Sequence, residues 1–220
     1  MRDRVIRDEI HKDILVPGHH AAIIDTREFQ RLRHIQQLST CEYVFPAANH
    51  NRFAHSLGAY HLAGQLTASL QDVQPGILSD DDAELVQLAA LLHDIGHPPF
   101  SHVLETPEVF ATYHSHEHWG RVLLESKETE VGAALVSTLG VQRTQRLFAL
   151  MDGATEHDGV AIAPFMKEIV SSQLDVDRMD YMVRDQANTG AQIGGFDIAR
   201  VLRALRVGAD GHFFVKTWGL

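Results

Sequence analysis

Residues 91–102, with the sequence LLHDIGHPPFSH, constrain what this chain can fold into more than any other stretch. The residues before them predict a helix, because Leu85, Leu88 and Leu92 recur at helical spacing. Ser79 begins a Ser-x-x-Asp capping box, which is typical of a helix N-terminus. The sequence therefore predicts an apolar core helix that ends inside this stretch.

His93 and Asp94 come at the end of that helix, next to each other in the sequence. Gly96 and the two prolines that follow cannot continue a regular helix, so we expect the backbone to turn there. The turn would bring His97 and His102 back towards the same place. We therefore expect several polar side chains to gather where an apolar helix meets a cleft.

A histidine beside an aspartate has two interpretations. Many such pairs lie on a solvated surface and bind nothing. At the end of a buried helix, however, a carboxylate needs a partner, because a desolvated charge without a cation is costly. Imidazole and carboxylate together suit a divalent ion such as manganese, iron or zinc. The position of His93 and Asp94 therefore favours a metal site over a surface pair.

The composition favours one folded domain in a reducing compartment. The chain has 220 residues, of which 45% are hydrophobic, so it can bury one sizeable core. We predict a single domain over residues 1–220, with its helical core over about 25–205. Cys41 is the only cysteine, no apolar run approaches the ~20 residues of a membrane span, and the N-terminus lacks the features of a signal peptide. We therefore expect a cytoplasmic protein without a membrane-spanning segment.

The charge of the chain limits its partners. The formal net charge is −10, from 19 basic and 29 acidic residues. This balance argues against an extensive nucleic-acid surface, since such a surface needs many contacts from Lys and Arg to phosphates. A phosphorylated substrate would have to be neutralised locally.

Two helices are expected before the central stretch. The first would follow Asp25 or Thr26 as N-cap and continue to about Leu38, and the second would cover residues 53–70. His55 falls between apolar positions of the second helix, where a lone histidine is more often a hydrogen-bonded core residue than a ligand. The first two dozen residues predict an amphipathic lead-in that carries no chemistry.

After the central stretch, Asp177, Tyr181 and Asp185 are spaced at i, i+4 and i+8, which places them on one face of a helix. That face is either an exposed acidic surface or part of a site. Residues 206–215 alternate around an Asp-Gly turn, which predicts a short β-hairpin. The sequence thus predicts an all-α fold, a helical bundle with a short C-terminal β-hairpin.

Several segments together resemble the HD-domain phosphohydrolase superfamily, and within it the deoxynucleoside triphosphate triphosphohydrolases. They occur in the order of the family, from about Phe29 to Asp185. The segments are FQRLRHIQQL at 29–38, NRFAHSLG at 51–58, the HD pair at 93–94 and LDVDRMDY at 174–181. The resemblance implies an HD-domain helical bundle.

The resemblance also implies one divalent metal ion per site, with manganese, iron, magnesium, nickel and zinc as candidates. Its ligands would be His55, His93, Asp94 and Asp177. Two imidazoles and two carboxylates leave positions on the ion open for water and a phosphate oxygen, as in a catalytic site rather than a structural one.

Catalytic groups near the ion follow from the same resemblance. His102 would donate a proton to the leaving oxygen, and His97 and His116 would hold the triphosphate or relay protons. Glu117 would orient His116 by accepting its second ring proton. Glu105 stands where relatives commonly have aspartate, and its longer side chain could shift the neighbouring histidine.

For the substrate, the resemblance implies a deoxynucleoside triphosphate that is cleaved to a deoxynucleoside and inorganic triphosphate. Gln37 and Asp185 would contact the sugar 3′-hydroxyl, and Tyr181 would crowd a 2′-hydroxyl. The guanidinium of Arg52 would bind phosphate oxygens two at a time. The expected substrate-binding residues are Gln37, Leu38, Arg52, Arg178, Tyr181 and Asp185. The family also implies a homo-oligomer, a dimer or larger.

Two departures from the family pattern and two alternative functions stay open. Residues 39–41, Ser-Thr-Cys, replace the glycine run that usually follows the Gln-Leu pair. Relatives continue well beyond the hairpin, so we expect a fragment or a reduced form of a longer protein. A different HD-type nucleotidase or phosphodiesterase would share the metal ligands, and a non-catalytic nucleotide sensor would keep the fold and only bind.

Overall fold

The computed structural model describes residues 2–106, 109, 112, 114–192 and 195–216. The α-helices are α1 (Gly18–Ile24), α2 (Arg27–Gln30), α3 (Arg52–Val73), α4 (Asp80–Leu92), α5 (His116–Glu125), α6 (Glu130–Asp152), α7 (Pro164–Val170), α8 (Val176–Thr189) and α9 (Ile198–Ala204). The 3-10 helices are η1 (Arg31–His34), η2 (Cys41–Tyr43) and η3 (Ser101–Leu104). The strands form three antiparallel pairs: β1 (Arg4–Asp8) with β2 (Lys12–Val16), β3 (Glu156–His157) with β4 (Val160–Ala161), and β5 (Leu205–Val207) with β6 (Phe213–Val215). The predicted all-α class is confirmed, since every sheet among the described residues is a two-stranded hairpin.

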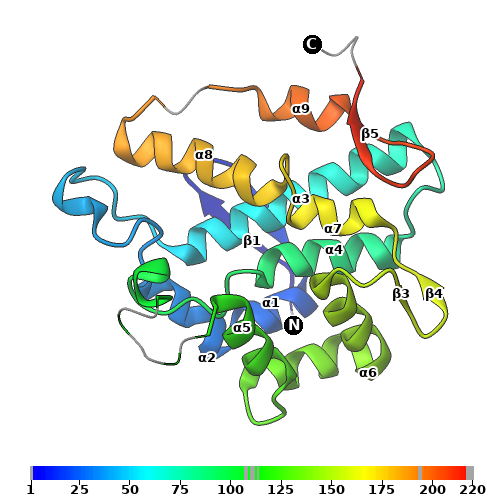
Figure 1. The fold of residues 1–220 in the computed structure, drawn as a ribbon, viewed down its shortest axis with the longest axis horizontal. Helices are drawn as coiled ribbons and strands as arrows, with labels where there is room; N and C mark the ends of the chain where they lie inside the picture. Colours follow the sequence, from blue (N-terminus) through cyan, green and yellow to red (C-terminus); the bar gives the residue numbers. More distant parts are fainter. Residues whose placement is uncertain (1, 107–108, 110–111, 113, 193–194, 217–220) are drawn as a thin grey trace.

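Helices α3 and α4 form the centre of the molecule. They pack against each other, α8 packs on α3, and α6 and α7 pack on α4 (Figure 1). The predicted stripe of α4 is buried at Leu85, Leu88 and Leu92, and Val86 and Leu91 between these positions are buried as well. The C-terminal half of α4, where Gln87 is the one polar residue, therefore lies in the interior, because its apolar faces need apolar neighbours.

The end of α4 turns the chain as predicted. Ser79 caps the start of the helix by accepting a hydrogen bond from a backbone N–H one turn later, and the helix ends at Leu92. A tight turn follows, in which the N–H of His97 donates to the carbonyl of Asp94 at 3.1 Å. Phe100 then has a φ of 63°, a left-handed conformation that changes the chain direction. The later histidines are thereby returned towards the end of α4.

The N-terminal segment corresponds to the expected amphipathic lead-in. It forms the β1–β2 hairpin, in which Ile14 and Val16 are buried while Leu15 between them is 70% exposed, the alternation of a strand with one face on the core. Asp8 ends β1 and accepts hydrogen bonds from the backbone N–H groups of two residues in the turn. The segment is amphipathic, as expected, and the structure adds that it is a hairpin that brings polar side chains to the interior.

The helix expected to continue to Leu38 is shorter. α2 ends at Gln30, η1 adds a tighter turn, and Ile35 is extended. The N–H of Arg52 donates to the carbonyl of Ile35 at 2.9 Å, and a second backbone hydrogen bond joins Gln37 to the segment before α3. Pairing with that segment overrides the helical preference of the local sequence. It places Gln37 beside the N-terminus of α3.

Two further short elements complete the description. The predicted C-terminal hairpin is confirmed, with Leu205 paired to Val215 and Val207 to Phe213. The β3–β4 hairpin lies in a stretch that shows no strand pattern, because two-residue strands are too short for one. Within the described residues, no helix is both long enough and apolar enough to cross a membrane. That residues 1–220 form one domain stays a prediction.

Candidate functional site

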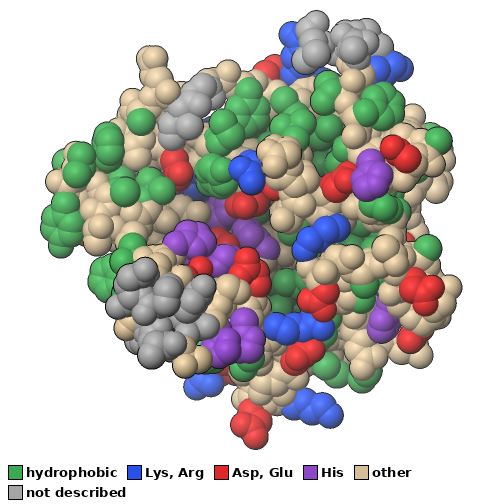
Figure 2. Space-filling model, in the orientation of Figure 1, with side chains coloured by type: hydrophobic (Ala, Val, Ile, Leu, Met, Phe, Trp, Pro, Cys, Tyr) green, Lys and Arg blue, Asp and Glu red, His purple; other side chains and the backbone are tan. Residues whose placement is uncertain are grey.

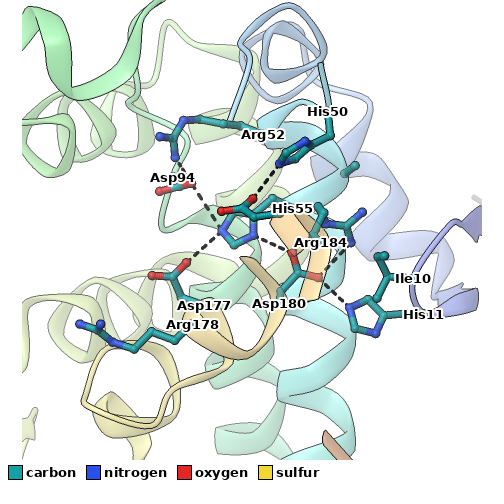
Figure 3. Close-up of polar contacts among 12 residues, drawn as sticks. Ile10, His11, His50, Arg52, His55, Asp94, Asp177, Arg178, Asp180 and Arg184 are labelled. Carbon is teal, nitrogen blue, oxygen red and sulfur yellow. Dashed lines mark hydrogen bonds and ion pairs between the residues drawn. The ribbon is translucent and has the colours of Figure 1, made fainter. Parts of the chain in front are cut away.

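Four of the predicted site residues meet at the centre of the molecule. His55 comes from α3, Asp94 from the end of α4 and Asp177 from the first turn of α8 (Figure 3), and His93 ends α4. The Nε2 atom of His55 lies 3.0 Å from an oxygen of Asp177 and 3.7 Å from one of Asp94. The Nε2 atom of His93 lies 3.4 Å from Asp94 and 3.5 Å from Asp177. The fold brings the four expected ligands together, and their binding of an ion stays a prediction.

The two histidines present the same nitrogen to this centre. The Nδ1 atom of His93 lies 2.8 Å from the carbonyl oxygen of Ala90, and Nδ1 of His55 lies 2.7 Å from a carboxylate oxygen of Asp180. Both partners are acceptors, so each Nδ1 carries the proton and donates it. Both Nε2 atoms are buried and make no hydrogen bond with a described residue. Their lone pairs, with the two carboxylates, form a donor set that fits a divalent metal ion.

The electrostatics of the cluster also favour a cation. Burial alone would raise the pKa of Asp94, but the neighbouring histidines and Arg52 hold it well below its usual value. Burial alone would lower the pKa of His55, but the carboxylates of Asp177 and Asp180 outweigh burial and raise that pKa to about 10. Several buried carboxylates around one point therefore stabilise a positive charge there, a proton or a metal ion.

Next to these four residues lies a second group of histidines. The Nδ1 atoms of His102 and His116 lie 3.0 and 3.1 Å from the carboxylate of Glu105. The ring of His97 stacks on that of His116 with 3.8 Å between the centroids, and its Nε2 lies 3.2 Å from Asp94. Burial lowers the pKa of His97 to about 4, despite the nearby Asp94. The two clusters are thus joined through one buried, neutral histidine.

The expected role of Glu117 is only partly supported by this geometry. Glu105, rather than Glu117, accepts the hydrogen bond from Nδ1 of His116. The carboxylate of Glu117 lies 3.4 Å from Nε2 of the same ring, and its side chain is 69% exposed. The buried glutamate is the stronger orienting group, because its position is set by two histidines at once.

Residues of both clusters line one cavity of about 620 Å³, namely His93, Asp94, Asp177, His97, His102 and His116. His55 and Glu105 are not among its lining residues. Figure 2 shows histidine and acidic side chains gathered around the middle of this face. The cavity is also lined by the expected substrate-binding residues Gln37, Leu38, Arg52, Tyr181 and Asp185. Arg178 is not among its lining residues, since the Nε atom of that side chain donates to the carbonyl of Ser172 at 2.9 Å. The roles of all these residues stay predictions.

The cations of the cavity differ in their partners. Arg52 is buried and forms an ion pair with Asp94, so it is not a surface residue. Arg121 binds two carboxylates on its own side of the cavity. Lys167, which the sequence reasoning missed, donates only to the backbone carbonyl of Met151 among the described residues. Burial lowers the pKa of Lys167, although two acidic neighbours oppose this.

A buried polar network behind His55 was also missed. Asp180 is fully buried and binds His55, His11 and Arg184 (Figure 3). Arg184 also donates a hydrogen bond to Asp8. Two of these residues belong to the N-terminal hairpin. The sequence holds one signal for the network, because Asp180 and Arg184 have the i, i+4 spacing of a helical ion pair.

Comparisons with known proteins agree with this geometry. The chain matches the family model described as "HD domain" over residues 52–185. It is 37% identical over 204 residues to the uncharacterized protein MJ1154 of Methanocaldococcus jannaschii, a match that covers 92% of this chain and 38% of that protein. It is 36% identical over 240 residues to the deoxynucleoside triphosphate triphosphohydrolase SAMHD1 of Homo sapiens, with 93% of this chain and 36% of that protein covered.

A solved structure is similar as well. The crystal structure of a phosphohydrolase from Bacteroides thetaiotaomicron superposes with a TM-score of 0.83 at 33% identity, and the match covers 98% of this chain and 50% of that chain. The chain therefore spans between about a third and a half of the length of these relatives.

Proposed function

The chain belongs to the HD domain family, and from this premise we propose that it is a metal-dependent phosphohydrolase that cleaves deoxynucleoside triphosphates to a deoxynucleoside and inorganic triphosphate. The observation that carries the proposal is the content of one cavity. It is lined by His93, Asp94 and Asp177 and by the histidines of a second cluster that is joined to them through His97. Nε2 of His55 lies 3.0 Å from Asp177, and the Nε2 atoms of His55 and His93 have no hydrogen-bond partner among the described residues.

The metal-binding part of the proposal rests on the donor atoms. His55 and His93 would bind through Nε2, and Asp94 and Asp177 through carboxylate oxygens. Manganese, iron, magnesium, nickel and zinc are the candidate ions. When bound, such an ion would lower the pKa of a water molecule and offset the negative charge that develops on the α-phosphate.

The side chains of the second cluster would manage the leaving group. Water attacks the α-phosphorus, the bond from phosphorus to the 5′-oxygen breaks, and that oxygen needs a proton. Nδ1 of His102 is hydrogen-bonded to Glu105 at 3.0 Å, so Nε2 is the atom that would donate the proton. His97, with a pKa near 4, is neutral at pH 7, and its single N–H faces Asp94 at 3.2 Å. It would therefore relay protons at its other nitrogen rather than donate hydrogen bonds to phosphate oxygens.

The remaining residues would recognise the sugar and the phosphates. Oε1 of Gln37 is buried and makes no hydrogen bond with a described residue, and one oxygen of Asp185 binds His50 at 2.8 Å. Both side chains can accept a hydrogen bond from a 3′-hydroxyl. Tyr181 lines the same cavity and would crowd a 2′-hydroxyl. Arg52 would supply positive charge for the phosphates.

Product analysis tests the proposal. The purified chain is incubated with Mn²⁺ and each deoxynucleoside triphosphate, the four ribonucleotides are run in parallel, and products are resolved by anion-exchange chromatography. We expect a deoxynucleoside and intact triphosphate, with slower cleavage of ribonucleotides. The His93→Ala variant, which loses one expected ligand, is the control and should be inactive.

Other outcomes would identify the alternatives. Release of orthophosphate or pyrophosphate instead of triphosphate would identify the protein as another HD-type nucleotidase or phosphodiesterase. A protein that binds Mn²⁺ in calorimetry and cleaves no nucleotide would be a nucleotide sensor. We also propose that the protein forms a homo-oligomer. Light scattering of the pure protein tests this, and a mass equal to that of the monomer would contradict it.

A further inference from the structure

We propose that Asp180 is the positioning residue of His55, and that the N-terminal hairpin, through His11 and Asp8, belongs to the metal centre. The inference rests on the proposed metal-dependent function. It gives a role to residues 4–16, for which the sequence alone predicts none, because neither the HD pair nor its flanking motifs include these residues.

The carboxylate of Asp180 is held from several directions. Its side chain is fully buried. Oδ2 accepts from Nδ1 of His55 at 2.7 Å and from Nε of Arg184 at 2.9 Å. Oδ1 accepts from Nε2 of His11 at 2.7 Å and from Nη2 of Arg184 at 2.9 Å. Each oxygen therefore binds two donors, and the carboxylate cannot move without breaking charge-assisted hydrogen bonds.

The hairpin holds the far side of this arrangement. Arg184 is also fully buried, and its Nη1 lies 3.0 Å from Oδ2 of Asp8. The other oxygen of Asp8 accepts from the backbone N–H groups of Ile10 and His11, at 2.9 and 2.8 Å. The carboxylate of Asp8 thus shapes the turn that carries His11 and also binds the arginine that holds Asp180. Figure 3 shows His11, Asp180 and Arg184 of this arrangement.

Helix α3 closes the arrangement from the opposite side. A Cβ atom added at Gly58 would lie 1.8 Å from Oδ1 of Asp180 and 2.6 Å from Nη2 of Arg184. Only a glycine permits this approach. Gly58 lies one turn after His55 on the same helix. Helix α3, which carries the expected ligand His55, is therefore in direct contact with the carboxylate of Asp180, which orients His55.

The consequence concerns the expected metal ligand. Asp180 keeps the proton of His55 on Nδ1 and fixes the plane of the ring, so the lone pair of Nε2 points at the centre of the cluster. Hydrogen-bond partners behind a metal-bound histidine typically change metal affinity by about 10- to 100-fold when they are lost. Moving Asp180 should therefore weaken metal binding even though no ligand is altered.

A matched pair of glycine substitutions in α3 tests the positioning role. In Gly58→Ala, the new methyl group must displace Asp180 from its four hydrogen bonds. In Gly64→Ala, the new methyl group meets the side-chain amide of Gln87 at 2.4 Å, a flexible group that can move aside. Both changes raise the helix propensity of α3 equally. By calorimetric titration of the full chain with Mn²⁺, we expect affinity to fall at least tenfold in Gly58→Ala and to stay unchanged in Gly64→Ala.

A second pair tests the hairpin. His11→Ala removes one donor to Asp180, and we expect Mn²⁺ affinity to fall three- to tenfold. His11→Gln keeps an N–H donor and should restore most of the affinity. His61→Ala is the control, because its ring lies 5.4 Å from that of His11 and makes no hydrogen bond to Asp180 within the described part of the chain. Melting of the metal-free variants shows that each is folded at the temperature of the titration.

The outcomes separate this inference from the proposed function. Wild-type affinity in both Gly58→Ala and His11→Ala would overturn the positioning role while leaving the metal site in place. Equal losses in the control variants would overturn it too, since the effect would then come from general destabilisation. A wild-type protein that binds no divalent ion would overturn the proposed function together with the inference.

Discussion

The histidines in and beside the cavity fall into two groups, according to the hydrogen-bond partners of each ring. His55 and His93 have an acceptor at Nδ1 and a buried Nε2 without a hydrogen bond to a described residue, which suits a ligand. His102 and His116 share the carboxylate of Glu105 instead, which suits proton transfer. All four rings face an acceptor with Nδ1, so the surroundings of Nε2 separate the two expected roles: this atom is buried and unpaired in His55 and His93.

Replacement of His102 tests the proton-transfer role. General acid catalysis contributes about 10²- to 10⁴-fold to rate, so His102→Gln should lower kcat by that factor. Its affinity for Mn²⁺ should match that of the wild type, since the ring is not among the expected ligands. His118→Gln, an exposed histidine nearby, is the control for both measurements. A parallel loss of Mn²⁺ affinity would assign His102 to metal binding instead.

Lys167 tests whether the cavity contains a phosphate-binding cation outside the sequence motifs. A hydrogen bond to a charged group is worth about 1.5–3 kcal/mol, so Lys167→Gln should raise KM for a triphosphate substrate about tenfold or more. The value of kcat should change little, because the lysine would bind substrate and transition state alike. Lys127→Gln removes an exposed lysine and should leave KM unchanged. An unaltered KM in Lys167→Gln would exclude contact with the phosphates.

At the level of the helices, one carboxylate outside the cavity, that of Glu84, links α1, α4 and α6. Glu84 of α4 lies 2.7 Å from Nε2 of His19 and 2.9 Å from Nε2 of His20, both in α1. The same carboxylate forms an ion pair with Arg143 of α6. Burial alone would raise the pKa of Glu84, but hydrogen bonds from these three residues lower it to about 2. The ionised form is therefore preferred in the folded state.

The pH dependence of stability follows from that lowered pKa. Its contribution is fully present above the ordinary pKa of about 4.5 and is lost as the pH falls towards about 2. At pH 7, Glu84→Gln should lower the free energy of unfolding by about 1–3 kcal/mol. Chemical denaturation at a series of pH values should show the difference from wild type shrinking between about pH 4.5 and pH 2. A difference that is constant over this range would mean that the charge of Glu84 contributes nothing.

At the scale of the whole molecule, the site exists only because distant helices meet. The expected ligands come from α3, α4 and α8, and the group behind His55 reaches the N-terminal hairpin. An ion bound at this point would link these elements and favour the folded chain over the unfolded one, in which the ligands are dispersed.

Thermal unfolding should report this link. A ligand present at 100 times its Kd stabilises the folded state by about 2.7 kcal/mol, so Mn²⁺ at that excess should raise Tm and EDTA should reverse the increase. Asp177→Asn should lose most of the Mn²⁺-dependent shift, while Glu128→Gln, at an exposed position, should keep it. An equal shift in Asp177→Asn would place the bound ion elsewhere.

Much of the fold could be predicted from local sequence. The helices α3, α4 and α8 follow from the spacing of their residues, the start of α4 follows from the Ser79 cap, and the turn after α4 follows from Gly96 and the prolines. The convergence of His55, His93, Asp94 and Asp177 followed from the resemblance of motifs, and the structure brings these side chains together. The helices and the turn are encoded within one or two helical turns, so they need no knowledge of distant partners, whereas the convergence of the four side chains could be expected only from the family resemblance.

What the sequence by itself determined is that the core of the chain is helical and where the central helix stops. Only the tertiary structure decided that the N-terminal segment is a hairpin, that the chain after α2 pairs with the segment before α3, and that Asp180 is buried behind His55. It also decided that Glu105 rather than Glu117 accepts from Nδ1 of His116. The physical reason is that a buried charged group pairs with whichever polar group lies next to it in the folded chain. Which group lies there depends on how residues far apart in the sequence pack against each other.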